Sequence, residues 1–230
     1  MKTLTKEMQA AITPEKALHL LIEGNKRLMN NLKVNRNLLK QANETSDGKA
    51  SLAVILSCID SRTSAELIFD QGLGDVFSIR IAGNIINEDI LGSMEFGCKV
   101  AGAKIIVVLG HTKCGAVKGA CGHVEMGNLT ALLSKIQPAV YDEKSIIPKN
   151  RNSENAEFVE KVSAINVKRS VHAIMERSLI LKEMIEKGDI GIVGGTHDIT
   201  TGEVKFYDDT LIIHPEIKEL FKPIPSHISN

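Results

Sequence analysis

The sequence predicts an α/β fold whose central, mostly parallel β-sheet has four parallel strands and a fifth, antiparallel edge strand, with helices flanking it. The first observation is a series of short apolar runs, rich in β-branched residues, at 52–57, 76–81, 105–109, 190–193 and 204–207. The second is that helical segments separate the first four runs, which leaves enough chain for parallel crossovers. The third is Gly202, which turns the chain from the fourth run into the fifth.

Residues 1–49 are expected to form an N-terminal helical arm. Thr13-Pro14-Glu15 supplies a capping hydroxyl, a proline for the first turn and an acidic residue near the positive end of a helix. That helix carries apolar residues on one side as far as Leu28. The polar segment 30–49 is expected to be a loop or a short helix before the first strand.

Residues 50–210 are expected to form the α/β core of a single domain, followed by a C-terminal tail at 211–230. Gly102 and Gly188 are expected to end helices, Pro138 is expected to stop another, and His214 begins a possible last helix in the tail. The expected helices of the core lie at 65–69, 89–101, 115–121, 128–137 and 154–187.

The composition excludes several classes of partner. The chain has 230 residues, a formal net charge of zero, 43% apolar and 24% charged residues, only 3% aromatic residues and no Trp. A neutral, aromatic-poor chain is a poor candidate for binding nucleic acid or an anionic membrane. No apolar stretch is long enough to span a membrane, and the N-terminus lacks a secretory signal. We expect a cytoplasmic protein with reduced cysteines, unless an export signal has been removed.

Two short motifs follow the first and third predicted strands. Cys58, Asp60 and Arg62 come directly after the first, and His111 and Cys114 come directly after the third. In parallel sheets, ligands bind beyond the carboxyl ends of strands where the strand order reverses. The two motifs can meet only if these strands are neighbours, so we expect the reversal between them.

Two sulfurs, an imidazole and a carboxylate form a ligand set that suits tetrahedral zinc. With Cys58, His111 and Cys114 bound, a fourth position is open to water, whose pKa zinc lowers toward ~7. With Asp60 also bound, the site is closed. Arg62 can hold Asp60 off the metal.

Alternatives remain at this point. The zinc could be purely structural, or the cysteines could be unrelated to any metal. Cys98 is best explained as a buried small hydrophobe, and Cys121 with His123 is a rival ligand pair. The glycines near the second strand match neither a dinucleotide fingerprint nor a Walker loop, so a nucleotide site is not expected.

The chain resembles the β-class carbonic anhydrases. Cys58-x-Asp60-x-Arg62 with His111-x-x-Cys114 matches the signature of that family, and the likeness extends over 13–207. Further matching segments are Glu66 to Gly72, Gly74 to Phe77, Arg80, Ala82 to Asn84, Gly115-Ala116, Asp198-Ile199 and Thr201-Gly202.

The resemblance implies one zinc ion per chain, held by Cys58, His111 and Cys114, with Asp60 and Arg62 as the functional dyad. Zinc-bound hydroxide would attack carbon dioxide, bicarbonate would leave, and a proton would pass to buffer. Asp60 would orient the hydroxide. The family also implies a homodimer or homotetramer, with the N-terminal helix crossing to the partner.

Four positions depart from the family pattern. Lys49 stands where many relatives have Gln, Ile81 where Asn is common, and His197 where many have Tyr. These changes put the lining of the cleft in doubt, but not metal binding. Ile55 replaces a Trp that some relatives use to bind bicarbonate and close the site. We therefore expect no such pocket, and an open site in which Asp60 pairs with Arg62.

Two other functions compete with carbon dioxide hydration. The same scaffold hosts zinc hydrolases of carbonyl sulfide or carbon disulfide, and fold alone does not separate these activities. A non-catalytic zinc or thiol-sensing protein is the second alternative. It has no use for a releasable carboxylate, so the presence of both Asp60 and Arg62 favours catalysis.

Overall fold

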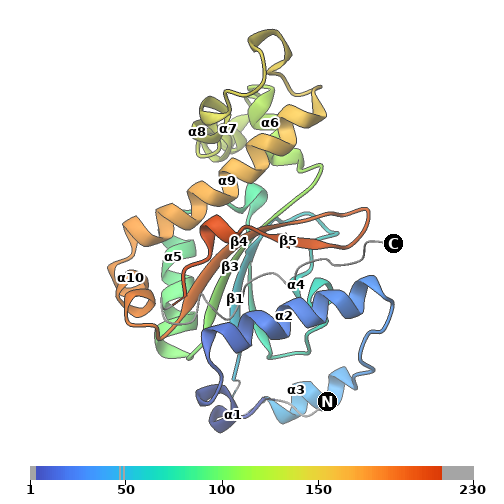
Figure 1. Cartoon of the computed structure of the whole chain (residues 1–230), viewed down its shortest axis with the longest axis vertical. Coiled ribbons are helices and arrows are strands. Elements are labelled where there is room, and N and C mark those ends of the chain that lie inside the picture. The colour runs from blue at the N-terminus through green and yellow to red at the C-terminus, as the bar shows by residue number, and fades with distance from the viewer. Residues whose placement is uncertain (1–3, 47, 49, 214–230) are drawn as a thin grey trace, which may run out of the picture.

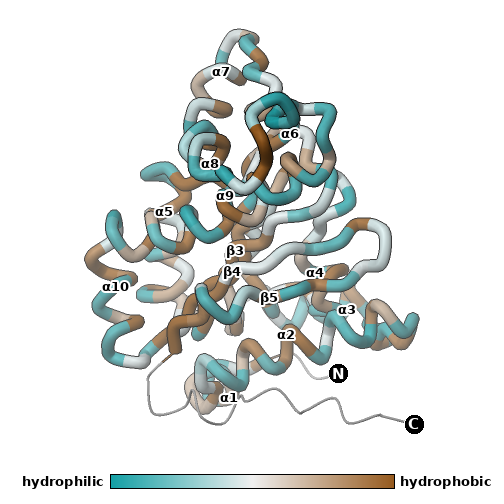
Figure 2. Tube along the Cα trace, turned by 45° about the horizontal axis from the view of Figure 1, so that its top comes forward, coloured by the Kyte–Doolittle hydropathy of each residue, from teal (hydrophilic) through white to brown (hydrophobic). Residues whose placement is uncertain are grey.

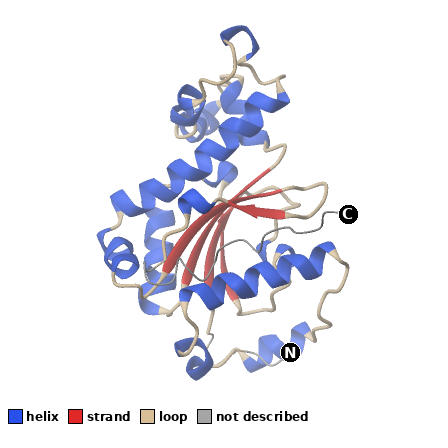
Figure 3. Ribbon diagram, viewed as in Figure 1, coloured by secondary structure: helices blue, strands red, loops and turns tan. Residues whose placement is uncertain are grey.

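The computed structural model describes residues 4–46, 48 and 50–213. Its five-stranded sheet has the order β2-β1-β3-β4-β5 (Figure 3). The first four strands in this order pair in parallel, and β5 is antiparallel to β4, as predicted. The neighbouring positions of β1 and β3 confirm the expected reversal of strand order. The strands are β1 Ala53–Ser57, β2 Val76–Arg80, β3 Ile105–His111, β4 Gly191–His197 and β5 Val204–Phe206.

Helices cover both faces of the sheet (Figure 1). They are α1 Lys6–Ala10, α2 Pro14–Met29, α3 Leu38–Glu44, α4 Ala65–Ile68, α5 Glu88–Glu95, α6 Gly115–Cys121, α7 Gly127–Ser134, α8 Gln137–Asp142, α9 Ala156–Arg177 and α10 Leu179–Glu186. Four short helical segments complete the described elements: η1 Ala82–Asn84, the π-helical turn η2 Phe96–Val100, η3 Pro148–Asn150 and η4 Asp208–Thr210.

The alternation of side chains along the strands divides the core into two layers. Val54, Leu56 and Ile106 face α5, α9 and α10, whereas Ile55 and Val107 face α2 and α4. Both faces are buried, which is why the central strands are continuous apolar runs. Figure 2 shows hydrophobic residues gathered along β3 and β4 at the centre of the molecule. Within the described residues, no helix has the length and hydrophobicity needed to cross a membrane.

A third apolar cluster lies beyond the carboxyl ends of the strands. It joins α6, α7 and α8 to the first half of α9, with Val117, Leu133, Ile136 and Phe158 among its buried members. The long helix α9 therefore runs along the sheet and reaches this cap, as Figure 1 shows. Cys58, His111 and Cys114 of the two sequence motifs are buried between the cap and the sheet, whereas Arg62 is exposed.

Two expected helices are interrupted. The segment expected at 128–137 ends at Ser134, and Pro138 lies in the first turn of α8, where its missing N–H costs no hydrogen bond. The segment 154–187 is split at Ser178, whose backbone is extended and whose hydroxyl accepts a hydrogen bond from the N–H of Leu181. Ser178 is thus a helix cap rather than a mid-helix residue. The helix expected from His214 lies outside the described residues.

The N-terminal helix α2 begins as predicted, with the Thr13 hydroxyl accepting from the N–H of Lys16. Its apolar face, including Ala17 and Leu21, packs against the sheet of its own chain. The polar segment after it contains a short helix, α3, which is one of the two expected outcomes.

We predict that Gly24→Ala strongly destabilises the protein. A Cβ at position 24 would lie 1.8 Å from the carbonyl oxygen of Phe69, at the end of α4, so α2 would have to move off the sheet. We expect a loss of about 3 kcal/mol in the free energy of unfolding, measured with urea. Gly92→Ala in α5 is the matched control, since its Cβ meets nothing within 4 Å. Equal stability of the two variants would show that α2 does not approach α4 this closely.

A buried carboxylate ties the N-terminal segment to the core. Asp70, whose side chain is 3% exposed, pairs with Arg36 and, at 2.6 Å, with Arg27. Its carboxylate also accepts from the N–H of Val34 at 3.3 Å. Burial opposes ionisation, but the hydrogen bonds from both arginines outweigh it and hold the pKa of Asp70 below its usual value.

This lowered pKa predicts a pH-dependent stability. Since the pKa of Asp70 is lower in the folded state than the ~3.9 of an unfolded Asp, its stabilisation is present above that pH and is lost as the pH falls through the folded pKa. Asp70→Asn should therefore cost about 3 kcal/mol at pH 7. The deficit should shrink as the pH falls below ~3.9, where Asp70 of the unfolded chain takes up a proton, and vanish once the pH is below the lower pKa of the folded state. Urea unfolding at several pH values measures it, with Glu23→Gln, in an exposed pair with Lys26, as the control. A pH-independent deficit would contradict the prediction.

Candidate metal centre

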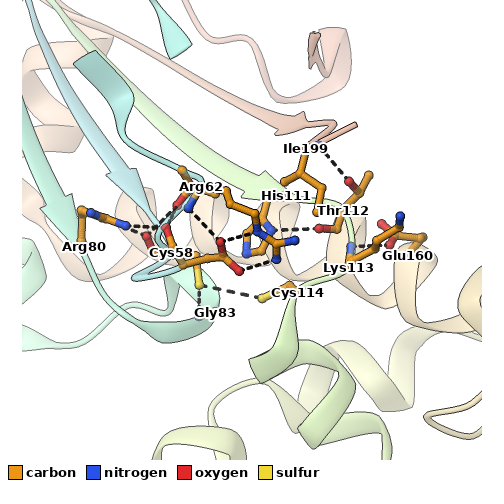
Figure 4. A network of polar contacts seen from close by, with 12 residues as sticks. Cys58, Arg62, Arg80, Gly83, His111, Thr112, Lys113, Cys114, Glu160 and Ile199 are labelled. Atoms are coloured by element: carbon orange, nitrogen blue, oxygen red, sulfur yellow. Dashed lines mark hydrogen bonds and ion pairs between the residues drawn. The ribbon is translucent and has the colours of Figure 1, made fainter. Parts of the chain in front are cut away.

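The two sequence motifs meet at the carboxyl edge of the sheet (Figure 4). Cys58 follows the last residue of β1, His111 is the last residue of β3, and Cys114 precedes the first residue of α6. Because Ser57 pairs with Leu109 in the parallel register, the two chain segments leave the sheet side by side.

Three ligand atoms converge here. The sulfurs of Cys58 and Cys114 and a ring nitrogen of His111 all lie within 4.8 Å of one another, and all three residues are buried. The Nδ1 atom of His111 lies 2.9 Å from the carbonyl oxygen of Thr112, whereas its buried Nε2 has no hydrogen-bond partner among the described residues. A proton on Nδ1 leaves the lone pair of Nε2 free to bind a metal. The donor set and this tautomer fit zinc.

The two cysteines differ in their ionisation. Their sulfurs are 3.9 Å apart, and the hydrogen bond between them lowers the pKa of Cys58 to about 4 while it raises the pKa of Cys114. The N–H of Gly83 also points at the sulfur of Cys58, at 3.4 Å. By contrast, burial alone raises the pKa of Cys98 to about 12. The thiolate is the form that binds a metal, so the lowered pKa of Cys58 favours a metal at this position.

Asp60 turns toward Arg62. The guanidinium donates to both carboxylate oxygens, at 2.9 and 2.7 Å, and the backbone N–H of Arg62 adds a third bond at 3.0 Å. These hydrogen bonds hold the pKa of Asp60 far below its usual range, so the group is a carboxylate at neutral pH. The converging ligand atoms come from Cys58, His111 and Cys114, and the carboxylate of Asp60 is not in that group.

Two residues that the sequence did not single out for a role support the turn that carries Cys58 and Asp60. Arg80, at the end of β2, donates to the carbonyl oxygens of Cys58 at 3.1 Å and Asp60 at 2.6 Å. The hydroxyl of Thr63 lies 2.9 and 2.8 Å from the same two oxygens. Arg80 belongs to a segment that matches the family pattern, but nothing in its spacing indicated these contacts.

The turn between His111 and Cys114 is held from two sides. Lys113 has a φ of 57°, a left-handed conformation that costs a non-glycine residue roughly 1–3 kcal/mol. Its N–H donates to the carboxylate of Glu160 in α9 at 2.7 Å. On the other side, the hydroxyl of Thr112 accepts from the N–H of Ile199 at 3.1 Å. Sequence analysis missed Glu160, because 47 residues separate it from Lys113.

A pocket of about 260 Å³ opens beside the centre. Cys58 and Asp60 line one side of it, and Leu129 and Leu133 line another. Small residues of α6, such as Gly119, also line the pocket, and their short side chains leave it unfilled. A pocket with this apolar lining admits a small, uncharged molecule.

The remaining positions of interest contribute no atom to the ligand cluster. Ile55 is fully buried in the layer that faces α2 and α4. His197 pairs in register with His111, and burial, followed by the charge of His111, lowers its pKa. Cys121 is buried in the cap, and it forms no metal-ligand group with His123 within the described part of the chain. Ile81 is partly buried against two of the apolar clusters, and Lys49 lies outside the described residues.

Comparison with known proteins decides the family. The family model described as carbonic anhydrase matches residues 53–204, from the start of β1 to the start of β5. The chain belongs to the carbonic anhydrase family. This stretch contains all five residues of the two motifs, and it begins after the N-terminal helices.

Individual relatives agree with this assignment. The chain is 36% identical to carbonic anhydrase 2 of Mycobacterium tuberculosis over 166 residues, which cover 70% of the chain and 76% of that relative. The fold resembles the β-carbonic anhydrase CcaA, with a TM-score of 0.67, 24% identity and coverage of 85% and 91% of the two chains. A β-carbonic anhydrase of Sordaria macrospora matches with a TM-score of 0.64, 23% identity and coverage of 72% and 85%. These matches confirm the predicted resemblance of the chain to the β-class carbonic anhydrases.

Proposed function

We propose that the protein catalyses the reversible hydration of carbon dioxide to bicarbonate and a proton, with one zinc ion per chain held by Cys58, His111 and Cys114. The observation that carries the proposal is the convergence of three buried ligand atoms beside a carboxylate that Arg62 holds away from them. Zinc bound there supplies a Lewis acid that brings the pKa of water close to 7.

The residues of the chain supply orientation. Asp60 is ionised at neutral pH. Its Oδ1 accepts two hydrogen bonds from Arg62 and its Oδ2 accepts one, so Oδ2 can accept a further hydrogen bond. It can therefore orient the reacting water and accept its hydrogen bond in a fixed direction. Arg62 fixes the carboxylate by a two-point contact, which a single-point contact with Lys would not do. The apolar pocket lined by Leu129 and Leu133 receives the uncharged substrate and limits competing water.

The competing substrates are carbonyl sulfide and carbon disulfide. They are linear, apolar triatomic molecules like carbon dioxide, so the pocket by itself does not discriminate strongly among them. The family assignment supports carbon dioxide. A non-catalytic zinc or thiol-sensing protein does not require a carboxylate held away from the ligands, so the Asp60–Arg62 pair favours catalysis over this alternative.

The deciding experiment is stopped-flow hydration of carbon dioxide at pH 7 to 9, on protein whose zinc content is assayed in the same sample. We expect about one zinc per chain and fast turnover that rises with pH. One zinc per chain without hydration, but with release of hydrogen sulfide from either sulfur substrate, would establish the alternative hydrolase. One zinc with neither activity would support the non-catalytic protein.

We further propose that the protein is a cytoplasmic homodimer or homotetramer. Phe96 is exposed by 53% beside β2, an edge strand whose outer side pairs with no other strand in the described part of the chain, and Val100 of the same turn η2 is exposed by 72%. A groove of about 850 Å³ lies between β2 and α5. Exposed apolar residues beside a strand edge are typical of association surfaces. The Sordaria macrospora proteins are described as tetrameric. Light scattering on eluting protein gives the mass, and a monomer at micromolar concentration would contradict this proposal.

The division of the chain into an arm at 1–49, a catalytic core at 50–210 and a tail at 211–230 is also a proposal. The family match from 53 to 204 supports the core boundaries. Because the apolar face of α2 packs on the sheet of the same chain, we propose that arm and core unfold together as one domain.

A further inference from the structure

A carboxylate from a distant helix holds the turn between two of the proposed zinc ligands. The backbone N–H of Lys113 donates to Oε1 of Glu160 at 2.7 Å (Figure 4). Lys113 is the residue immediately before Cys114 and two residues after His111. Glu160 lies in α9 and is partly exposed, so it is neither a core residue nor a ligand of the cluster.

The conformation of Lys113 explains why this turn needs an outside partner. A lysine at φ 57° is outside the regions that residues with a Cβ prefer. The turn is therefore not the conformation of lowest free energy for this segment by itself. The φ and ψ angles of Lys113 set the direction in which Cys114 follows His111. Any relaxation of Lys113 therefore moves the Cys114 sulfur relative to the His111 ring.

Helix α9 is a rigid support for the carboxylate. It packs against β3, which ends in His111, and against α6, which begins after Cys114. Phe158 and Val159, immediately before Glu160, are buried in the cap. A negatively charged acceptor on such a helix makes a stronger bond to an N–H than a neutral acceptor does.

We propose that Glu160 is a positioning residue of the metal centre, which fixes the turn from His111 to Cys114 in its metal-binding geometry. The inference rests on the zinc site of the proposed function. Glu160 touches neither the ligand side chains nor the substrate pocket, and it acts through the backbone of Lys113 alone.

The test compares the full-length parent with Glu160→Ala, Glu160→Gln and Glu157→Ala. Glu157 is one helical turn earlier in α9 and forms an exposed pair with Lys161, so its loss controls for removing a carboxylate from this helix. Zinc affinity is measured by competition with a chelator, and the cobalt-substituted proteins give the absorption bands of the thiolate-bound metal.

We expect Glu160→Ala to weaken zinc binding by about tenfold or more, within the range seen when outer partners of ligands are removed, and to shift the cobalt bands. Glu160→Gln keeps an acceptor oxygen and should lie between the parent and the alanine variant. Glu157→Ala should match the parent. The metal-free forms of all four proteins should unfold at similar temperatures, because the contact is local.

The outcomes separate this inference from the proposed function. A parent that binds zinc and hydrates carbon dioxide, with Glu160→Ala equal to it in affinity and spectrum, would overturn the role of Glu160 alone. An equal loss in Glu157→Ala would assign the effect to α9 as a whole and would also overturn it. A parent that binds no zinc would overturn the proposed function together with this inference. If Glu160→Ala failed to fold, Glu160→Gln would decide, and parental zinc affinity in that variant would reject the proposal.

Discussion

Cys58→Ser is expected to remove zinc and to lower carbon dioxide hydration by at least ~10³-fold, because water without the metal keeps its pKa of 15.7. Serine has nearly the same shape as cysteine, so the β1 end of the site should remain intact. Its hydroxyl is not ionised near neutral pH, whereas the contact with Cys114 lowers the pKa of the Cys58 thiol. The substitution thus replaces a thiolate ligand by a neutral hydroxyl, which binds zinc weakly.

The measurement is zinc per chain in the purified protein, followed by stopped-flow hydration on the same sample. Cys98→Ala is the control, since it also removes a buried thiol, but from η2, whose buried residues join the apolar layer that faces α5. It should retain one zinc per chain and parental turnover per folded molecule. Zinc at one per chain in Cys58→Ser, with activity preserved, would show that the ligand set has been assigned wrongly.

Asp60→Ala is expected to keep zinc and to lose activity by roughly 10²–10³-fold, the usual contribution of a positioned acid–base group. The ligand cluster does not include Asp60, so metal affinity should change little. Without the carboxylate, the reacting water has no fixed acceptor, and Arg62 is left without its partner at the mouth of the site. The loss should appear in the turnover number at every pH from 7 to 9, because Asp60 is ionised throughout this range.

Asp142→Ala is a matched control for this variant. Asp142 pairs with Arg169 on the surface of α8 and α9, so its removal also breaks an Asp–Arg contact, but far from the ligands. We expect parental rates from it. If Asp60→Ala hydrated carbon dioxide as fast as Asp142→Ala, the dyad would have no catalytic role.

The sheet and the ligand cluster were predictable because both depend on strong local signals. Buried parallel strands must be apolar along their whole length, as the runs at β1 and β3 are. Ligands that directly follow such strands emerge at one edge of the sheet, which fixed the meeting of Cys58 and His111 before any contact was known. The order of β1 and β3 followed from the need to bring the two motifs together.

Other features could not be predicted, since they depend on partners distant in sequence. The contact between Glu160 and Lys113 joins a carboxylate to a backbone N–H. Glu and Lys are both common on protein surfaces, so neither residue type indicates the contact. Ser178 interrupts a helical pattern that continues on both sides of it, and only its extended backbone reveals the cap. Asp70 pairs with Arg27 of the predicted N-terminal helix and with Arg36 of the following segment, whose composition indicated no more than a loop or short helix.

The position of Arg80 has a consequence for how the protein could be controlled. Its backbone belongs to β2, the edge strand of the described sheet, while its guanidinium donates to the carbonyl oxygens of Cys58 and Asp60. A molecule that pairs with this edge would therefore bind a strand whose last residue contacts the turn that carries Cys58 and Asp60. If association at this edge displaced Arg80, it would change the support of Asp60, and by linkage the orientation of Asp60 would change the affinity of that association by the same factor.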